Sequence, residues 1–484
     1  MDRQDPTQAA DAPPHVARGS DTDPRAHAPG RRTRWACVGV GSRSTMYLDA
    51  IAGRFRDANE VVALCDTNAG RLGLAADRIA AGGADRPRCY DAADLGRMLR
   101  EVRPDGVIVT TPDATHDEVI VQALDAGCEV VTEKPLTTTA EKAQRILDAV
   151  ERNGRHVRVM FNYRYAPTST QVKDLLMGGA IGDILSVELT WLLNTHHGAD
   201  YFRRWHSSKE RSGGLMVHKA THHFDLVNWW LGARPVQVMG TGSRQFYTPA
   251  TARRLGLTGS HERCRTCPEA TDCAFHLDIE QDVDLAPLYA AHEHHDGYER
   301  DRCVFRPEID IEDTMHVLVR YDTGALLTYA LAAYGAWEGY RVAFNGTTGR
   351  LEHEVVARAG IEPVAVAQGV IEEDTVGIRI LPMRGAPREI EPWIGTGSHG
   401  GGDAVMLAEL FSSVPPDPYL RAADERSGCD SILVGVAANQ CFQTGMPVRI
   451  ADLTSGVPAP VMAPMPARTM PIPMPPDDRR PGAG

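Results

Sequence analysis

The segment of residues 34–66 constrains the fold more than any other part of this 484-residue chain. An apolar run leads into the turn Gly39-Val-Gly41, a helical pattern begins near Ser44, and a second apolar run ends at Asp66. Strand, glycine turn, helix, strand and acid form the layout of a dinucleotide-binding unit. The bare backbone at the glycines would let a pyrophosphate approach the N-terminus of the helix.

The same segment bears on which dinucleotide is bound. Asp66 can accept hydrogen bonds from both ribose hydroxyls and would repel a 2′-phosphate, so NAD is favoured over NADP. Arg43 and Arg71 lie nearby in sequence and keep NADP open. Ser44 stands where the usual fingerprint has its third glycine, so the motif alone predicts a cofactor site less strongly than the complete fingerprint would.

Strands and helices continue to alternate beyond this unit. Residues 105–111 read as a strand that runs into Thr111-Pro112, and residues 129–132 read as another that runs into Glu133-Lys134-Pro135. Such alternation predicts a doubly wound parallel sheet, whose ligands lie at the carboxyl ends of the strands. Lys134, next to the expected cofactor cleft, is therefore a candidate functional residue.

A second cluster of titratable residues lies in the segment 212–225. His218 and His222 are four residues apart and would share one face of a helix, with Asp225 three residues further on. Such a cluster can transfer a proton, hold a metal, or simply cap a helix and satisfy its hydrogen bonds.

Composition narrows the class of protein. The net charge of −13 argues against nucleic acid as a partner, and no apolar run is long enough to predict a membrane-spanning helix. We expect residues 1–32 to be a disordered extension and residues 454–484, rich in Pro and Met, to be a disordered tail. Arg31-Arg32 is not followed by the apolar region of an export signal, so a cytoplasmic protein is expected.

Four of the ten cysteines lie in a polar segment at about residues 240–306, which reads as an insertion. Cys264 and Cys267 form a C-x2-C pair, and Cys273 and Cys303 follow it. Four thiolates of this kind could bind a structural zinc ion in tetrahedral geometry. Free or partly paired thiols packed in an insertion are the other interpretation.

From about Arg34 to Leu453 the chain resembles the Gfo/Idh/MocA family, named for glucose–fructose oxidoreductase and inositol dehydrogenase. The resemblance rests on the glycine turn, Asp66, Thr111-Pro112 with His116, Glu133-Lys134-Pro135, Phe161–Pro167, Gly178–Gly182 and Gly213–Asp225. It implies a Rossmann domain, here residues 33–157, and an α/β domain, here residues 158–453, with a large open, mostly antiparallel sheet. It also implies tightly held NAD(H) or NADP(H), sugar or polyol substrates, and a homo-oligomer formed through the open sheet face.

The resemblance also implies roles for single residues. Lys134 corresponds to the active-site lysine, His222 to the histidine acid/base, and Asp225 to its orienting or structural partner. Many relatives carry an aspartate where this chain has His218, which could bind a substrate hydroxyl, act as a second acid/base, or be a neutral helix residue. The predicted cofactor-binding residues are Gly39, Gly41, Ser42, Arg43, Ser44, Asp66, Thr111, Pro112, His116, Glu133 and Lys134.

Arg164, His197, Arg204 and His218 are the predicted substrate contacts. The expected activity is transfer of a hydride between a nicotinamide cofactor and a sugar or polyol hydroxyl carbon. A redox-neutral glycosidase, lyase or epimerase that oxidises its substrate only transiently is the alternative, since a changed proton relay at His218 suits a changed reaction. A nucleotide-binding sensor is a third hypothesis, which the pairing of Lys134 with His222 argues against.

Overall fold

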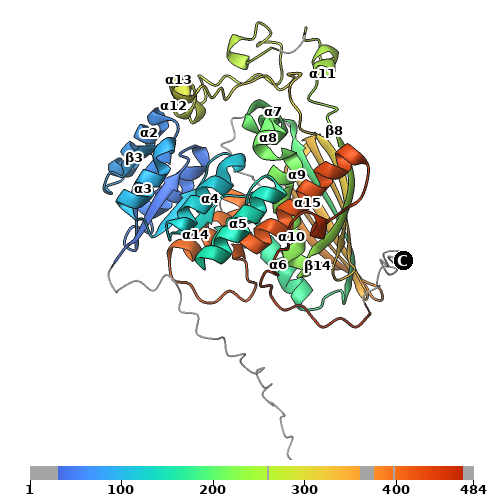
Figure 1. The fold of residues 1–484 in the computed structure, drawn as a ribbon. Helices are drawn as coiled ribbons and strands as arrows, with labels where there is room; N and C mark the ends of the chain where they lie inside the picture. Colours follow the sequence, from blue (N-terminus) through green and yellow to red (C-terminus); the bar gives the residue numbers. More distant parts are fainter. Residues whose placement is uncertain (1–30, 259–260, 360–374, 396–397, 472–484) are drawn as a thin grey trace, which may run out of the picture.

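The computed structural model describes residues 31–258, 261–359, 375–395 and 398–471. Two sheets organise this part of the chain (Figure 1). The first has seven strands in the order β15-β6-β5-β4-β1-β2-β3. These strands are β1 (Thr33–Val38), β2 (Asn59–Asp66), β3 (Arg88–Asp91), β4 (Gly106–Val109), β5 (Glu129–Thr132), β6 (Val157–Val159) and β15 (Ala423–Asp424).

The first sheet is the predicted doubly wound Rossmann sheet, since β1 to β6 pair in parallel. Strands β1, β2, β4 and β5 are largely apolar and buried, as expected for strands covered on both faces by helices, whereas the edge strand β3 is mostly exposed. The connecting helices are α1 (Thr45–Ala52), α2 (Ala69–Ala81), α3 (Leu95–Val102), α4 (His116–Asp125) and α5 (Ala140–Asn153). The carboxyl ends of β1, β2, β4 and β5 consequently meet along one edge, which carries the candidate site.

The second sheet confirms the predicted large, mostly antiparallel architecture. Its nine strands lie in the order β14-β13-β12-β11-β7-β10-β9-β8-β16, and β7 pairs in parallel with β10 while the other pairs are antiparallel. The strands are β7 (Ile184–Asn194), β8 (Pro235–Ser243), β9 (Thr314–Tyr321), β10 (Leu326–Gly335), β11 (Trp337–Gly346), β12 (Gly349–Ala359), β13 (Thr375–Pro382), β14 (Arg388–Ile390) and β16 (Val448–Arg449).

Helices join the two sheets into one structure. The helices of this half are α6 (Pro167–Met177), α7 (Thr195–Arg203), α8 (Lys209–Ser212), α9 (Gly214–His218), α10 (Ala220–Leu231), α14 (Gly402–Phe411) and α15 (Glu425–Thr444). Every residue of α10 is buried, which explains why this helix is apolar around most of its circumference.

The C-terminal part of the chain returns to the first sheet. In α14, Phe411 packs edge-on against Trp35 of β1, with ring centroids 5.5 Å apart. Residues Ala423 and Asp424 of β15 then pair antiparallel with β6. The Rossmann sheet is thus completed by residues far beyond the predicted boundary at residue 157.

The insertion lies between β8 and β9 and contains α11 (Pro249–Arg254), α12 (Leu285–Leu288) and α13 (Glu293–Asp296). Figure 1 shows it crossing above both sheets, with α12 and α13 beside α2. The described residues include no helix that is long and apolar enough to cross a membrane.

The predicted disorder of residues 454–484 is wrong for residues 454–471. Ala463 is buried, and the backbone N–H groups of Thr469 and Met470 donate to the carboxylate of Asp183 at 2.8 and 2.7 Å. This segment has no regular helix or strand, so hydrophobic periodicity gave no sign that it packs. Residues 1–30 and 472–484 lie outside the described residues.

Candidate active site

The glycine turn after β1 packs directly against the loop after β4. Gly39 adopts φ +88°, and a Cβ atom there would lie 2.7 Å from the carbonyl carbon of Thr110. Only glycine fits such a turn without strain or a backbone clash. This requirement explains why the first glycine of the motif stands at this position.

Asp66 lies at the carboxyl end of β2, beside the turn. Its carboxylate accepts hydrogen bonds from the backbone N–H groups of Val40 at 2.6 Å and Asn68 at 2.8 Å. Arg71 lies 3.2 Å from the same carboxylate and also pairs with Asp296 of the insertion. The guanidinium of Arg71 is therefore already neutralised by two carboxylates, which weakens the case for a 2′-phosphate at this position.

Two of the predicted cofactor-binding residues, Glu133 and His116, are buried and hydrogen-bond to the loops after β1, β4 and β5. Glu133 is buried and accepts hydrogen bonds from Arg43 Nε and the Tyr47 hydroxyl, each at 2.6 Å. His116 is also buried, and its ring nitrogens lie 2.8 Å from the Pro135 carbonyl and 2.9 Å from the Thr111 carbonyl. This geometry indicates that Glu133 and His116 position the loops, and that Arg43 is held within the protein.

The remaining predicted cofactor residues line the turn and the loop after β4. Ser44 is buried, and its hydroxyl donates to the Gly41 carbonyl at 2.7 Å. Ser42 directs its backbone N–H to the Tyr289 hydroxyl at 3.1 Å. Thr111 is half-buried and Pro112 is exposed at the loop surface.

The centre of the candidate site is a chain of three side chains. The Nζ atom of Lys134 lies 3.3 Å from Nε2 of His218 and donates to the His218 carbonyl at 3.2 Å. On the other side of the ring, Nδ1 of His218 lies 2.5 Å from Oδ2 of Asp113. The Lys134–Pro135 peptide bond is cis. The structure thus brings Lys134 and His218 together and places Asp113 beside them.

Burial is the largest cause of the pKa shifts of Lys134, His218 and Asp113. It lowers the pKa of Lys134 to about 8, although the negative charge of Asp113 acts in the opposite direction. Burial and the charge of Lys134 together hold the pKa of His218 well below its usual range. Burial also raises the pKa of Asp113, against the opposing charge of Lys134. With its pKa lowered to about 8, Lys134 can take up and release a proton near neutral pH more readily than an ordinary lysine.

His222 lies on the next helix, because the helical segment is interrupted at Lys219 between α9 and α10. The His222 ring lies 4.5 Å from the ring of Tyr163 and 5.8 Å from that of Phe161, measured between centroids. The Tyr163 hydroxyl accepts from Lys219 Nζ at 3.2 Å. The predicted single helix carrying both histidines is therefore two shorter helices.

Asp225 and Arg164 form a buried pair with two parallel hydrogen bonds of 2.6 and 2.7 Å. Burial raises the pKa of Asp225 to about 6, although Arg164 opposes this shift. Because Arg164 is almost fully enclosed and its guanidinium is used by Asp225, the geometry argues against the predicted substrate contact of Arg164. It agrees with the structural role considered for Asp225.

The other predicted substrate contacts lie on α7 and at its end. The two ring nitrogens of His197 lie 2.8 Å from the Glu338 carboxylate and 3.0 Å from the Tyr201 hydroxyl. Arg204 pairs with Asp200 at 3.0 Å. The Tyr201 ring is 5.5 Å from the His218 ring, so His197 lies one residue away from the proposed proton chain.

Two residues near His218 were missed from the sequence, namely Asp113 and Tyr201. Asp113 directly follows Pro112 at the carboxyl end of a predicted strand, so its position did carry a signal. Tyr201 carried none beyond its polar, aromatic neighbourhood. His206 also lies here, with its ring centroid 4.1 Å from that of His218.

Sequence comparison assigns the family of this fold and site. The profile described as "Oxidoreductase family, NAD-binding Rossmann fold" matches residues 33–161, and the one described as "Oxidoreductase family, C-terminal alpha/beta domain" matches residues 173–450. The chain belongs to the Gfo/Idh/MocA oxidoreductase family. Its Rossmann domain therefore binds NAD(H), and the glycine turn and Asp66 have the geometry for it.

Several relatives resemble this Gfo/Idh/MocA protein. YteT of Bacillus subtilis (strain 168), a provisionally named oxidoreductase, is 35% identical over 86% of this chain and 97% of its own length. Inositol 2-dehydrogenase of Salmonella typhimurium is 30% identical over 40% of this chain and 53% of its own length. The solved structure of the WlbA dehydrogenase from Bordetella pertussis with NADH and UDP-GlcNAcA has a TM-score of 0.58 and 20% identity, over 87% of this chain and 99% of its own.

The four insertion cysteines of this Gfo/Idh/MocA protein converge. Cys264, Cys267, Cys273 and Cys303 all line one cavity of about 20 Å³, and they form no disulfide. A space of this size admits one water-sized particle. Among the described residues, the ligand atoms of His261, Cys267 and Glu269 are the ones that lie within 4.8 Å of one another. The four thiols line the same cavity, but their sulfur atoms do not all lie within 4.8 Å of one another.

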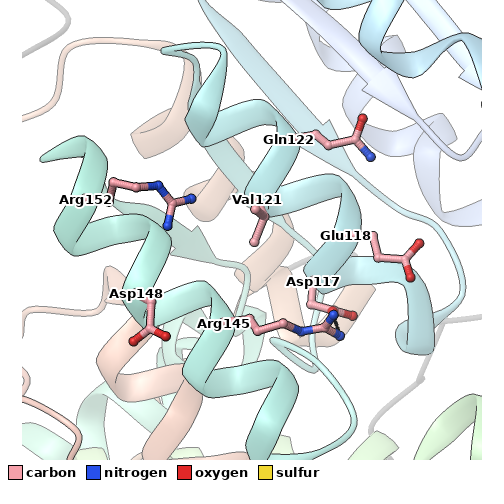
Figure 2. Close-up of a pocket in the computed structure, with 7 residues that line it drawn as sticks. All are labelled: Asp117, Glu118, Val121, Gln122, Arg145, Asp148 and Arg152. Atoms are coloured by element: carbon pink, nitrogen blue, oxygen red, sulfur yellow. Dashed lines mark hydrogen bonds and ion pairs between the residues drawn. The ribbon is translucent and has the colours of Figure 1, made fainter.

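One surface hollow of this Gfo/Idh/MocA protein lies away from the proposed proton chain. It is a groove of about 420 Å³ between α4 and α5, lined by Asp117, Glu118, Val121, Gln122, Arg145, Asp148 and Arg152 (Figure 2). Figure 2 shows Arg145 reaching across the groove to Asp117, which it pairs with. The groove is open and none of the predicted site residues lines it, so the carboxyl edge of the sheet remains the candidate site.

Proposed function

We propose that this enzyme transfers a hydride between NAD(H) and the hydroxyl-bearing carbon of a sugar or polyol. The observation that carries the proposal is the chain Lys134–His218–Asp113 at the carboxyl ends of β4 and β5. The substrate class is supported by relatives named inositol 2-dehydrogenase. The solved aldose-aldose oxidoreductase from Caulobacter crescentus has a TM-score of 0.56 and 17% identity over 87% of this chain and all of its own, and it supports the fold alone.

The proton chain supplies what oxidation of a carbinol requires. The hydroxyl must lose its proton as the bound nicotinamide takes up the hydride. The Lys134 ammonium stabilises negative charge on the substrate oxygen, and with a pKa near 8 it can also exchange a proton. His218 accepts from Lys134 through Nε2 and donates through Nδ1–H to Asp113, which fixes its tautomer and ring orientation.

His222 acts in this proposal as a second acid/base, as its match to the family motif implies. It lies beside Tyr163, whose hydroxyl is held by Lys219. His197 and Arg204 are the proposed substrate contacts, since both lie on the side of His218 that α7 covers. Gly39, Gly41, Ser42 and Asp66 are the proposed first contacts of the dinucleotide.

A redox-neutral reaction on a sugar, with transient oxidation, is the second proposal for the same site. The observation that favours it is His218 itself, which puts a neutral imidazole where many relatives have a carboxylate. A chain of lysine, histidine and aspartate can return a proton to the product as readily as it removes one from the substrate. The two proposals differ in whether reduced cofactor accumulates.

One experiment separates them. Purified enzyme is incubated with NAD and a panel of sugars and polyols while the absorbance of reduced nicotinamide and the release of products are followed. Net reduction supports the dehydrogenase, and product formation without net reduction supports the redox-neutral reaction. Wild-type enzyme that binds NADH but acts on no substrate, with binding unchanged in Lys134→Ala and His222→Ala, would favour a sensor and contradict both.

We further propose that Cys264, Cys267, Cys273 and Cys303 hold a structural zinc ion at the base of the insertion. The shared cavity supports this, as do backbone N–H groups that hydrogen-bond to the sulfurs of Cys267 and Cys273 and oppose the rise in thiol pKa caused by burial. The thiols would have to move closer together to coordinate an ion. Metal analysis of the purified protein and of Cys264→Ser tests the proposal, and wild-type protein without bound zinc would exclude it.

A homo-oligomer formed through the open face of the nine-stranded sheet is proposed as well. Met239 and Leu318 lie opposite each other on β8 and β9 and are 46% and 52% exposed. Light scattering of wild-type protein and of Leu318→Lys measures the mass in solution, and a wild-type monomer would contradict the proposal. A cytoplasmic location stays a prediction from the sequence.

A further inference from the structure

One part of the insertion contacts the Rossmann domain at its cofactor edge. We call residues 285–301, which include α12 and α13, the arm. In Figure 1 the arm leaves the insertion and lies over the end of α2, far in sequence from the strands that it covers. This contact could not be predicted from local patterns, because more than 200 residues separate the two segments.

The arm makes three polar contacts with the loops after β1 and β2 and with the first turn of α2. The Tyr289 hydroxyl accepts from the Ser42 N–H at 3.1 Å, and Asn68 Nδ2 donates to the His292 carbonyl at 2.8 Å. Asp296 pairs with Arg71, which in turn lies 3.2 Å from Asp66. The arm thus touches both the glycine turn and the surroundings of the acid that is expected to bind the ribose.

The fit between the arm and the Rossmann domain is close. A Cβ atom at Gly41 would lie 3.3 Å from the Tyr289 hydroxyl, and one at Gly70 would lie 2.2 Å from Nδ1 of His292. The second of these contacts would force the His292 ring to move. Glycine at position 70 therefore lets the His292 ring lie where it does, whereas a Cβ atom at position 41 would only make a tight contact with Tyr289.

The chemistry of the arm suits a pyrophosphate. A tyrosine hydroxyl can accept from one group and donate to another, so Tyr289 can keep the Ser42 N–H and donate to a phosphate oxygen. The guanidinium carbons of Arg71 and Arg300 lie 5.8 and 6.0 Å from the centre of the Tyr289 ring. Both guanidiniums are already paired with carboxylates, Arg71 with Asp66 and Asp296 and Arg300 with Asp200, so the Tyr289 hydroxyl is the group of the arm that would contact a phosphate oxygen.

The arm also extends to the substrate side. Arg300 is buried and pairs with Asp200 of α7 at 2.7 Å, and Asp200 pairs with Arg204. Arg204 is a proposed substrate contact and belongs to the same cluster as His218. One segment therefore links the loops that hold the dinucleotide to the helix that faces the substrate.

We propose that the arm is part of the dinucleotide site, that Tyr289 hydrogen-bonds to the pyrophosphate, and that the arm must lift before NAD(H) can leave. The inference rests on the proposed use of NAD(H) and deepens it by assigning a retention element to this chain. A cofactor held in this way leaves slowly between turnovers, as a redox-neutral reaction requires.

The test is the rate at which NADH leaves the full-length protein, measured by stopped-flow fluorescence after mixing the NADH complex with excess NAD. Tyr289→Phe removes the hydroxyl, and Asp296→Asn weakens the anchor of the arm. We expect NADH to leave about tenfold faster from each variant, the loss of roughly one hydrogen bond to a charged group. Val283→Ala is the control, since Val283 lies in the insertion and is 84% exposed.

Three outcomes separate a failure of the arm proposal from a failure of the proposed function. If wild-type protein binds NADH, and both variants bind and release it at the wild-type rate with unchanged thermal unfolding, the arm has no part in retention and the inference is overturned. If Tyr289→Phe alone accelerates release, the pyrophosphate contact holds and the Asp296 anchor is excluded. A wild-type protein that binds no NADH contradicts the proposed function itself.

Discussion

The Nδ1 atom of His218 lies 2.5 Å from Oδ2 of Asp113, and both side chains are buried. The two residues come from different domains, since Asp113 follows β4 of the Rossmann sheet and His218 ends α9. Their contact turns the opposite ring nitrogen of His218 toward Lys134. The relative placement of the two domains therefore determines whether the proton chain is continuous.

The pH dependence of catalysis follows from this chain. Lys134 has its pKa lowered to about 8, so the fraction of neutral amine rises as the pH passes through 8. For sugar oxidation we expect kcat/KM to increase with pH and to level off above about 8. The negative charge of Asp113 raises the pKa of Lys134, so in Asp113→Asn the rise of kcat/KM should occur at lower pH. If the rise occurs at the same pH in the variant and the wild type, Asp113 does not influence the titration of Lys134.

Replacement of Lys134 should separate chemistry from cofactor binding. Lys134→Met removes the group that stabilises charge on the substrate oxygen, and kcat should fall by about 10²–10⁴-fold. NADH affinity, measured by fluorescence titration, should stay near the wild-type value. Lys134→Arg is the matched variant, since it keeps the positive charge but cannot give up its proton near pH 8. In the arginine variant the rise of kcat/KM near pH 8 should disappear. If the rise remains, it reports the titration of a group other than Lys134.

The Arg164–Asp225 pair should matter more for stability than for substrate binding. Asp225→Asn leaves the buried guanidinium without its carboxylate, and the free energy of unfolding should fall by about 3 kcal/mol. Urea unfolding measures this change. In a double variant, Arg164→Met with Asp225→Leu, most of the loss should be recovered because no charge is left unpaired. A large rise in KM with unchanged stability would instead restore Arg164 as a substrate contact.

Two glycines with nearly equal backbone angles allow the close approach at the glycine turn to be tested. Gly39 has φ +88° and would place a Cβ atom 2.7 Å from the backbone of Thr110, whereas Gly83 has φ +84° and no atom within 4 Å of its Cβ position. Gly83→Ala should lower the free energy of unfolding by about 1 kcal/mol, the cost of placing an alanine at a positive φ angle. Gly39→Ala should cost more and weaken NADH binding, as thermal unfolding and titration would show. Equal effects would mean that the Thr110 contact is unimportant.

Much of the fold could be predicted because its signals are local. Apolar strands, glycine turns and the acid at the end of β2 each occupy a few neighbouring residues, and the carboxyl ends of parallel strands necessarily meet. Lys134 and Asp66 could be proposed as site residues for this reason. The same reasoning gave the parallel first sheet, and the family resemblance gave the antiparallel second sheet.

The parts that could not be predicted depend on contacts between distant residues. Tyr289 and Ser42 are 247 residues apart, and nothing in either segment specifies the other. The interruption at Lys219 was missed because an apolar, buried segment looks like one continuous helix. The tail near Ala463 was missed because a segment rich in Pro and Met can bury side chains without any periodic pattern.

The pairing of β15 with β6 has a consequence for how the protein is made. Val159 of β6 pairs with Ala423, which is synthesised 264 residues later. A ribosome needs roughly 10–50 s for that length at ordinary rates. During this interval β6 is an edge strand with unpaired backbone groups, open to pairing with other chains. Chaperone demand during translation is therefore expected to be greatest between the appearance of β6 and that of β15.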